Sequence, residues 1–173
     1  MNFYDTADMY SQGESEILVG KALRKKRDKV FIATKGGYCL PKRKRLIQFI
    51  KPFAKPIVRA LGLRRSAVPS ALSAPISQDF SPGYLREAVE ASLRRLQSDH
   101  IDLYQLHSPP REELNGTRLQ DTLELLARLK TEGKIREYGI ALDSVYDAVQ
   151  CLDMEGIASL QMPFGLMDQQ ALD

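Results

Sequence analysis

Short apolar runs alternate along the chain with longer stretches in which apolar residues recur at helical spacing. The short runs predict five strands, at residues 2–4, 30–34, 101–106, 135–141 and 157–162. The longer stretches predict crossover helices, one beginning at the cap Ser81 and others over 118–132 and 145–154. Regular alternation of strand and helix indicates an α/β protein built on a parallel sheet.

The first strand–helix–strand unit already places chemistry at strand ends. Residues 2–4 lead to Asp5, a polar turn then carries Tyr10, and the next strand stops at Lys35. Between them, Ser15 is expected to cap a helix whose apolar positions include Leu18 and Leu23. Parallel strands joined by crossover helices point the same way, so Asp5 and Lys35 should meet at one face of the sheet.

Asp5, Tyr10 and Lys35 together suit the protonation of a carbonyl oxygen. A lysine near a tyrosine favours the phenolate and is expected to lower the phenol pKa from its usual value of about 10. Asp5 is expected to hold Lys35 charged and oriented. Such a phenol can deliver a proton while another group delivers a hydride.

The stretch FYDTADMYSQGESEILVGKAL, followed by VFIATK, resembles the aldo-keto reductase family. LRRLQSDHIDLYQLHSPP is similar to the family segment that bears its active-site histidine. By this resemblance Asp5, Tyr10, Lys35 and His107 form the reductase tetrad. Tyr10 would donate the proton, Lys35 and Asp5 would tune it, and His107 would orient the carbonyl. His100 lies outside the pattern and is expected on the surface.

The resemblance implies a (β/α)8 TIM barrel, yet the matching segments run only from the family's second strand to its sixth. A closed barrel needs eight strands and usually about 250 residues. We therefore expect residues 1–173 to form one partial NADP-dependent oxidoreductase domain, an incomplete barrel with about five parallel strands. A fragment of a longer gene, a degenerate paralogue and a split protein all fit, and the position of Met1 favours a truncated gene model. The open sheet edges predict self-association.

The implied cofactor is NADPH, with NADH as the alternative, and the expected contacts are Asp5 and Gln161. Gln161 matches a family residue that binds the nicotinamide carboxamide. The family's usual Gly-Val-Ser-Asn is replaced by a sequence ending in Ala141 and Leu142, whose side chains form no hydrogen bonds. Asp143 and Ser144 are the polar candidates to replace them.

The implied activity is reduction of a small-molecule aldehyde or ketone to the alcohol. The loss of polar side chains after residue 140, together with the three missing strands, supports an alternative: a non-catalytic binding or regulatory protein that keeps the fold.

Composition is ordinary for one globular domain, with 43% hydrophobic and 27% charged residues. No apolar run reaches the roughly 20 residues of a membrane-spanning helix. The N-terminus shows no basic-then-apolar leader, so a cytoplasmic protein is expected. Cys39 and Cys151 fit no metal-binding spacing, and neither a metal site nor a disulfide is predicted.

The net charge of +3 conceals a strongly basic segment, because residues 29–78 contain eleven lysines and arginines and no acid. Most of this segment is expected to belong to a loop insertion, at about 38–80, that folds over the mouth of the active site. The alternative is a basic arm, residues 42–65, that meets an acidic membrane surface, nucleic acid or a dinucleotide phosphate. No base-reading motif is present, so nucleic acid is not predicted as a partner.

Overall fold

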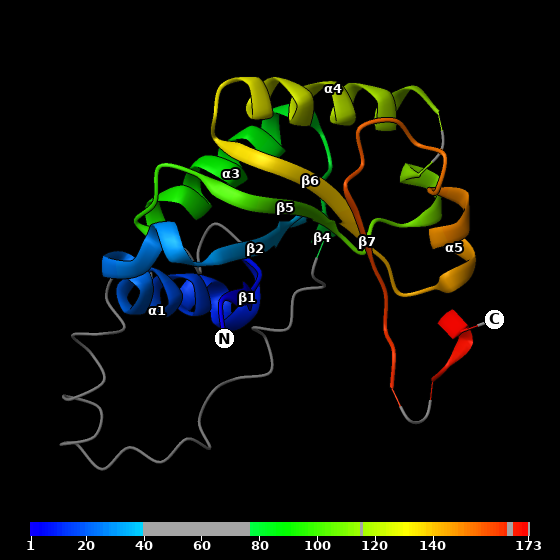
Figure 1. The fold of residues 1–173 in the computed structure, drawn as a ribbon. Helices are drawn as coiled ribbons and strands as arrows, with labels where there is room; N and C mark the ends of the chain where they lie inside the picture. The colour runs from blue at the N-terminus through cyan, green and yellow to red at the C-terminus, as the bar shows by residue number, and fades with distance from the viewer. Residues whose placement is uncertain (40–76, 115, 166–167, 173) are drawn as a thin grey trace, which may run out of the picture. The chain divides into compact units, whose positions relative to one another are not determined.

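The computed structural model describes residues 1–39, 77–114, 116–165 and 168–172 (Figure 1). Nearly all of the predicted insertion at 38–80, and the whole of the basic arm at 42–65, lie outside the described residues. The chain divides into two compact units, one comprising Met1–Tyr38 with Gln78–Asp173 and the other Cys39–Ser77. Apart from Cys39 and Ser77, the described residues all belong to the first unit.

Strands and helices alternate in the order that the sequence predicts. The strands are β1 (Phe3–Asp5), β2 (Phe31–Gly36), β3 (Tyr38–Cys39), β4 (Ser77–Gln78), β5 (Ile101–His107), β6 (Ile135–Ala141) and β7 (Ser159–Gln161). The α-helices are α1 (Glu14–Leu23), α3 (Pro82–Leu96), α4 (Thr117–Thr131) and α5 (Val145–Gln150). Short 3-10 helices are η1 (Tyr10–Gly13), η2 (Arg24–Lys29), η5 (Arg111–Glu113) and η6 (Gln170–Leu172). α5 ends four residues before the predicted end of its helix.

Five strands form one parallel sheet in the order β1-β2-β5-β6-β7, and β3 pairs with β4 in a separate two-stranded sheet. Helices α1, α3 and α4 cover one face of the large sheet (Figure 1). Edge strands of a flat five-stranded sheet would lie about 19 Å apart. Here the side chain of Gln161 in β7 donates a hydrogen bond to Asp5 in β1 at 3.1 Å, so the sheet is strongly curled. This confirms the predicted incomplete α/β barrel.

The hydrophobic core fills the space between the sheet and its covering helices. α3 contributes Leu85 and Val89, α4 contributes Leu126 and Leu129, and all four are fully buried. Tyr104 of β5 is buried on the same side. These apolar stripes lie at the spacing that the sequence shows, so the helices hold the strands in the register that sets the strand ends.

Helix starts follow the predicted chemistry in one case and depart from it in another. Ser81 caps α3 as predicted, accepting a hydrogen bond from the backbone N–H of Tyr84 at 3.4 Å. The prediction that Ser15 caps α1 is wrong. The helix follows Gly13, which has φ = 88°, and the Ser15 hydroxyl instead lies 2.7 Å from that of Thr6. Glycine accepts this backbone conformation without strain, and this helix start has no side-chain capping bond.

Helix α1 packs through a glycine rather than through all its apolar residues. Leu23 is buried, but Leu18 is 65% exposed. Gly20 is buried against α3, where an added Cβ would overlap the backbone carbonyl of Leu96. The close approach of the two helices therefore depends on the missing side chain at this position.

The described parts of the chain contain no helix long and apolar enough to cross a membrane. Within the same residues, no group of three or more His, Cys, Asp and Glu side chains could hold a metal ion. Cys39 and Cys151 are free thiols.

Candidate active site

Three polar side chains stand at the carboxyl ends of neighbouring strands: Asp5 on β1, Lys35 on β2 and His107 on β5. The Lys35 ammonium donates hydrogen bonds to Asp5 Oδ1 at 2.6 Å and to the Thr6 carbonyl at 3.1 Å. The lysine side chain is 3% exposed and that of Asp5 is 33% exposed. The ion pair is thus anchored from inside the sheet and open to solvent on the Asp5 side.

Tyr10 lies over this ion pair at the start of η1. Its ring centroid is 5.6 Å from Lys35 Nζ and 5.9 Å from the centroid of the His107 ring, which it meets edge-on. The loop that carries Tyr10 continues the β1–β2 ladder, because the N–H of Asp8 donates to the Lys35 carbonyl at 3.0 Å. The structure therefore brings all four predicted tetrad residues together.

The pKa of Tyr10 differs from the sequence prediction. Partial burial, and then the negative charge of Asp5, raise the pKa of the phenol above its ordinary value. The expected lowering is therefore wrong for this structure. Lys35 is engaged by Asp5 and Thr6 and faces the tyrosine ring, while the Asp5 carboxylate opposes a phenolate. At neutral pH the phenol keeps its proton.

His107 is held between two aromatic rings. The Tyr38 ring also meets it edge-on, with centroids 4.9 Å apart. Burial, and then the charge of Lys35, lower the pKa of the imidazole, so the ring is neutral at pH 7. Its Nδ1 is buried and has no hydrogen-bond partner among the described residues. A neutral imidazole with an unused nitrogen can hydrogen-bond a small polar ligand.

Gln161, the predicted cofactor contact, bonds to the same carboxylate as Lys35. Its Nε2 donates to Asp5 Oδ2 at 3.1 Å, joining residues 156 positions apart. A pocket of about 370 Å³ lies beside this pair, lined by residues of β1, β5 and β7 and the adjoining Met162. Gln105, which the sequence analysis did not single out, also lines it and is 1% exposed overall. A lining that combines polar and apolar side chains suits a cofactor ring with a carboxamide.

The segment after β6 offers the pocket little further polarity. Ala141 and Leu142 are both buried. Asp143, the first polar candidate to replace them, accepts a hydrogen bond from the Ser108 hydroxyl at 3.0 Å. Ser144 precedes α5 and makes no side-chain capping bond. Asp143 therefore holds the turn after β5.

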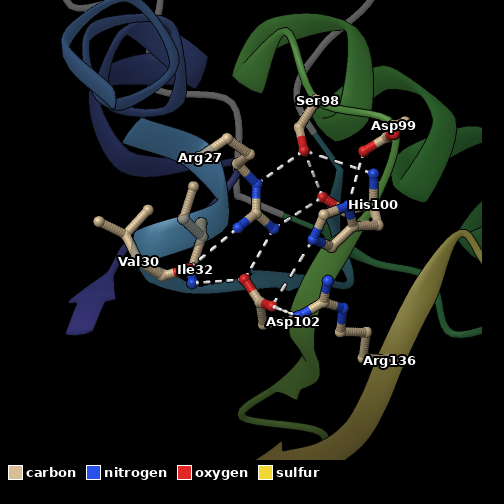
Figure 2. A network of polar contacts seen from close by, with 8 residues as sticks. All are labelled: Arg27, Val30, Ile32, Ser98, Asp99, His100, Asp102 and Arg136. Carbon is tan, nitrogen blue, oxygen red and sulfur yellow. Dashed lines mark hydrogen bonds and ion pairs between the residues drawn. The ribbon is translucent and has the colours of Figure 1, made fainter. Parts of the chain in front are cut away.

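A second polar cluster occupies the opposite, amino ends of the strands (Figure 2). Asp102 is 1% exposed; its Oδ2 accepts from the Ile32 N–H at 2.9 Å and pairs with Arg27 at 2.7 Å. Its Oδ1 accepts from Arg136 at 2.9 Å. His100 was expected on the surface, but its side chain is only 14% exposed and lies against Asp102 at 3.7 Å. That expectation is wrong, because the turn before β5 folds back onto the network.

Comparison with known proteins decides the family. The sequence model of the aldo/keto reductase family matches residues 1–172. The chain belongs to the aldo/keto reductase family. It is 31% identical over 170 residues to the uncharacterized oxidoreductase YqkF of Bacillus subtilis, covering 98% of this chain and 45% of that protein. It is also 31% identical over 173 residues to the NADH-specific methylglyoxal reductase of Escherichia coli, with the same coverage of 98% and 45%.

Solved structures show the same relationship. The holo form of aldo-keto reductase AKR11C1 from Bacillus halodurans superimposes with a TM-score of 0.70 at 33% identity, over 95% of this chain and 44% of that one. An aldo/keto reductase from Klebsiella pneumoniae in complex with NADP and acetate gives 0.63 at 26% identity, over 95% and 44%. The chain thus spans less than half the length of these family members.

Proposed function

We propose that this chain carries the proton-transfer site of an NAD(P)H-dependent reductase that converts an aldehyde or ketone to an alcohol. The observation that carries the proposal is the convergence of Asp5, Tyr10, Lys35 and His107 at adjacent strand ends. Membership of a family of oxidoreductases supports it. We place the protein in the cytoplasm, which the two free cysteines fit.

Each residue has a role that its surroundings support. Tyr10 keeps its proton at neutral pH and is 43% exposed, so it can donate that proton to a carbonyl oxygen. Lys35 stabilises the phenolate that is left, and Asp5 fixes the ammonium. The neutral His107 ring, beside Tyr10, orients the carbonyl through a hydrogen bond.

NADPH is the proposed cofactor, with NADH as the alternative, since related structures contain NADP or NADPH and one relative is named an NADH-specific reductase. When bound, the cofactor supplies the hydride. Gln161 and Asp5 would hold the nicotinamide end, and their mutual hydrogen bond would open to receive its carboxamide. The donor and acceptor groups of a glutamine side chain match those of a carboxamide.

Replacing Tyr10 by Phe tests the proposal. Carbonyl-dependent oxidation of NADPH, measured with a panel of small aldehydes that includes methylglyoxal, should fall roughly 100- to 10,000-fold because the proton donor is lost. Tyr146→Phe is the matched control, since Tyr146 is 62% exposed on α5 and lies outside the site; its turnover should be unchanged. Equal turnover in Tyr10→Phe and the unmodified chain would refute the assignment.

The apolar Ala141 and Leu142 favour a second candidate, a non-catalytic binding protein that keeps the fold. Titration of NADPH, followed by nicotinamide fluorescence, separates the two. Saturable binding with no turnover on any carbonyl of the panel would support the binding protein. Turnover that Tyr10→Phe abolishes would support the reductase.

We further infer that the chain associates with itself through its sheet edges. Among the described strands, β1 pairs only with β2 and β7 only with β6, so each presents an unpaired backbone edge. Sedimentation velocity over a concentration series should show a species larger than the 19.5 kDa monomer. A monomer at every concentration would contradict this inference.

A further inference from the structure

Behind the loop that carries Tyr10 lies a buried ionic cluster that the proposed reaction does not use. Asp8 is 6% exposed, and Glu16 of α1 and Tyr104 of β5 are fully buried. Glu16 accepts a hydrogen bond from the Thr34 hydroxyl at 2.7 Å on one oxygen and from Arg95 at 2.5 Å on the other. Both oxygens of this carboxylate are therefore engaged.

Asp8 and Tyr104 are the incompletely bonded members of the cluster. Neither Asp8 Oδ1 nor the Tyr104 hydroxyl has a hydrogen-bond partner in the described part of the chain. Both border Gly36, where an added Cβ would overlap the Tyr104 hydroxyl and lie 3.4 Å from Asp8 Oδ2. The glycine thus leaves room for two buried polar groups that form no hydrogen bond with each other.

The charges around Asp8 favour a proton on one of the two buried acids, Asp8 and Glu16. Glu16 faces it from α1, Arg95 from α3 and Tyr104 from β5, while the Lys35 ammonium on β2 is turned to Asp5. Two buried carboxyls thus share a single guanidinium. Since Glu16 holds the ion pair, Asp8 is the group that stays neutral.

Electrostatics agree with this count. Burial, and then the charge of Glu16, raise the pKa of the Asp8 carboxyl from 3.8 to about 7, against smaller opposing effects of Arg95 and the Met9 N–H. With such a pKa, Asp8 is protonated in a large fraction of molecules near pH 7, and the protonated acid can donate a hydrogen bond as well as accept one.

We propose that Asp8 is a positioning residue for Tyr10: while its buried carboxyl carries a proton, it holds the loop between β1 and η1 in place. The loop is short, with the Asp8 N–H bonded to the Lys35 carbonyl and the Tyr10 N–H bonded to the Ala7 carbonyl at 3.2 Å. Loss of the proton leaves two buried negative charges against one guanidinium, which drives Asp8 and Tyr10 toward solvent. The catalytic consequence rests on the proposed function of Tyr10; the structural one does not.

Carbon NMR of the aspartate carboxyls in the full chain tests the proton on Asp8, with Asp8 assigned by its absence in Asp8→Asn. The unmodified chain should show an aspartate that titrates near pH 7. A midpoint near the ordinary value of about 4 would overturn the proposal.

Positioning is tested by the Tyr10 ring resonance, assigned with Tyr10→Phe. In the unmodified chain this resonance should shift in step with Asp8, and in Asp8→Asn it should be independent of pH between 6 and 8, a range of roughly one unit either side of the midpoint. A Tyr10 resonance in the unmodified chain that does not change as Asp8 titrates would overturn the proposal.

Turnover supplies a separate readout. If the chain is a reductase, kcat should fall as the pH rises through the titration midpoint of Asp8. In Asp8→Asn this decrease of kcat with pH should disappear, with little change in KM. Loss of this pH-dependent decrease of kcat in the variant supports the proposal, and an unchanged decrease contradicts it. Absence of turnover would refute the proposed function but not the positioning role, because the NMR measurements test that role separately.

Discussion

Near each end of strands β2 and β5 lie a carboxylate, a cation and a histidine, and the two carboxylates differ in burial and in the number of their partners. At the amino ends, buried Asp102 makes short contacts with Ile32, Arg27 and Arg136 (Figure 2). At the carboxyl ends, Asp5 is one third exposed and meets one ammonium and one amide. There His107 has a buried nitrogen without a partner in the described residues, and Tyr10 is 43% exposed.

The two carboxylates differ in burial and in the number of their partners. Asp102 is buried, makes short contacts with three partners and holds separate chain segments together. Asp5 has two partners and one open side, which suits the proposed proton transfer. A histidine nitrogen without a hydrogen-bond partner among the described residues occurs at both ends, so burial of the carboxylate, rather than residue type, distinguishes them.

The largest effect is expected from Asp102→Ala. This change leaves Arg27 with fewer partners, frees Arg136 and leaves the Ile32 N–H unpaired in the interior. The free energy of unfolding, measured by urea denaturation, should fall by about 3–5 kcal/mol. Asp99→Ala is the matched control at the same end: its side chain is 92% exposed, and its loss should cost about 1 kcal/mol or less. Equal losses in the two variants would contradict the comparison.

A mutation at the carboxyl end should affect activity more than stability. Lys35→Met removes the ammonium while retaining much of the buried chain, and Asp5 keeps access to water. The free energy of unfolding should fall by less than in Asp102→Ala, because the Asp5 carboxylate that loses its partner can be hydrated. The proposed carbonyl reduction should fall roughly 100-fold, because the phenolate left by proton transfer loses its cation. A destabilised protein with normal turnover would reverse the roles assigned to the two ends.

The smallest effect is expected from pH acting through His107. The folded-state pKa of this half-buried ring lies below its unfolded value. As pH falls through about 6.5, the unfolded chain therefore takes up the proton first, and stability decreases. In His107→Gln this contribution is absent, so the free energy of unfolding should decline less between pH 7 and pH 5. A difference between the two proteins that is constant with pH would contradict the lowered pKa.

Regular periodicity explains why most of the fold was predictable. All five strands of the large sheet and their parallel direction follow from the alternation of apolar runs and helices. The residues at the strand ends could be named because they directly follow these runs. Close approach was not predictable in the same way. Gly20 contacts Leu96 across 76 positions, and no local pattern distinguishes it from a flexible glycine.

The sequence by itself determined the order of elements, the family and the residue types at the strand ends, because these depend on local periodicity and on a long ordered motif. Tertiary structure alone decided the electrostatics. The pKa of Tyr10 depends on its burial and on Asp5, which also bonds to Lys35. The protonation of Asp8 depends on Glu16 of α1 and Arg95 of α3. Burial and charge at a site are sums over segments far apart in the chain, so they exist only once the chain has folded.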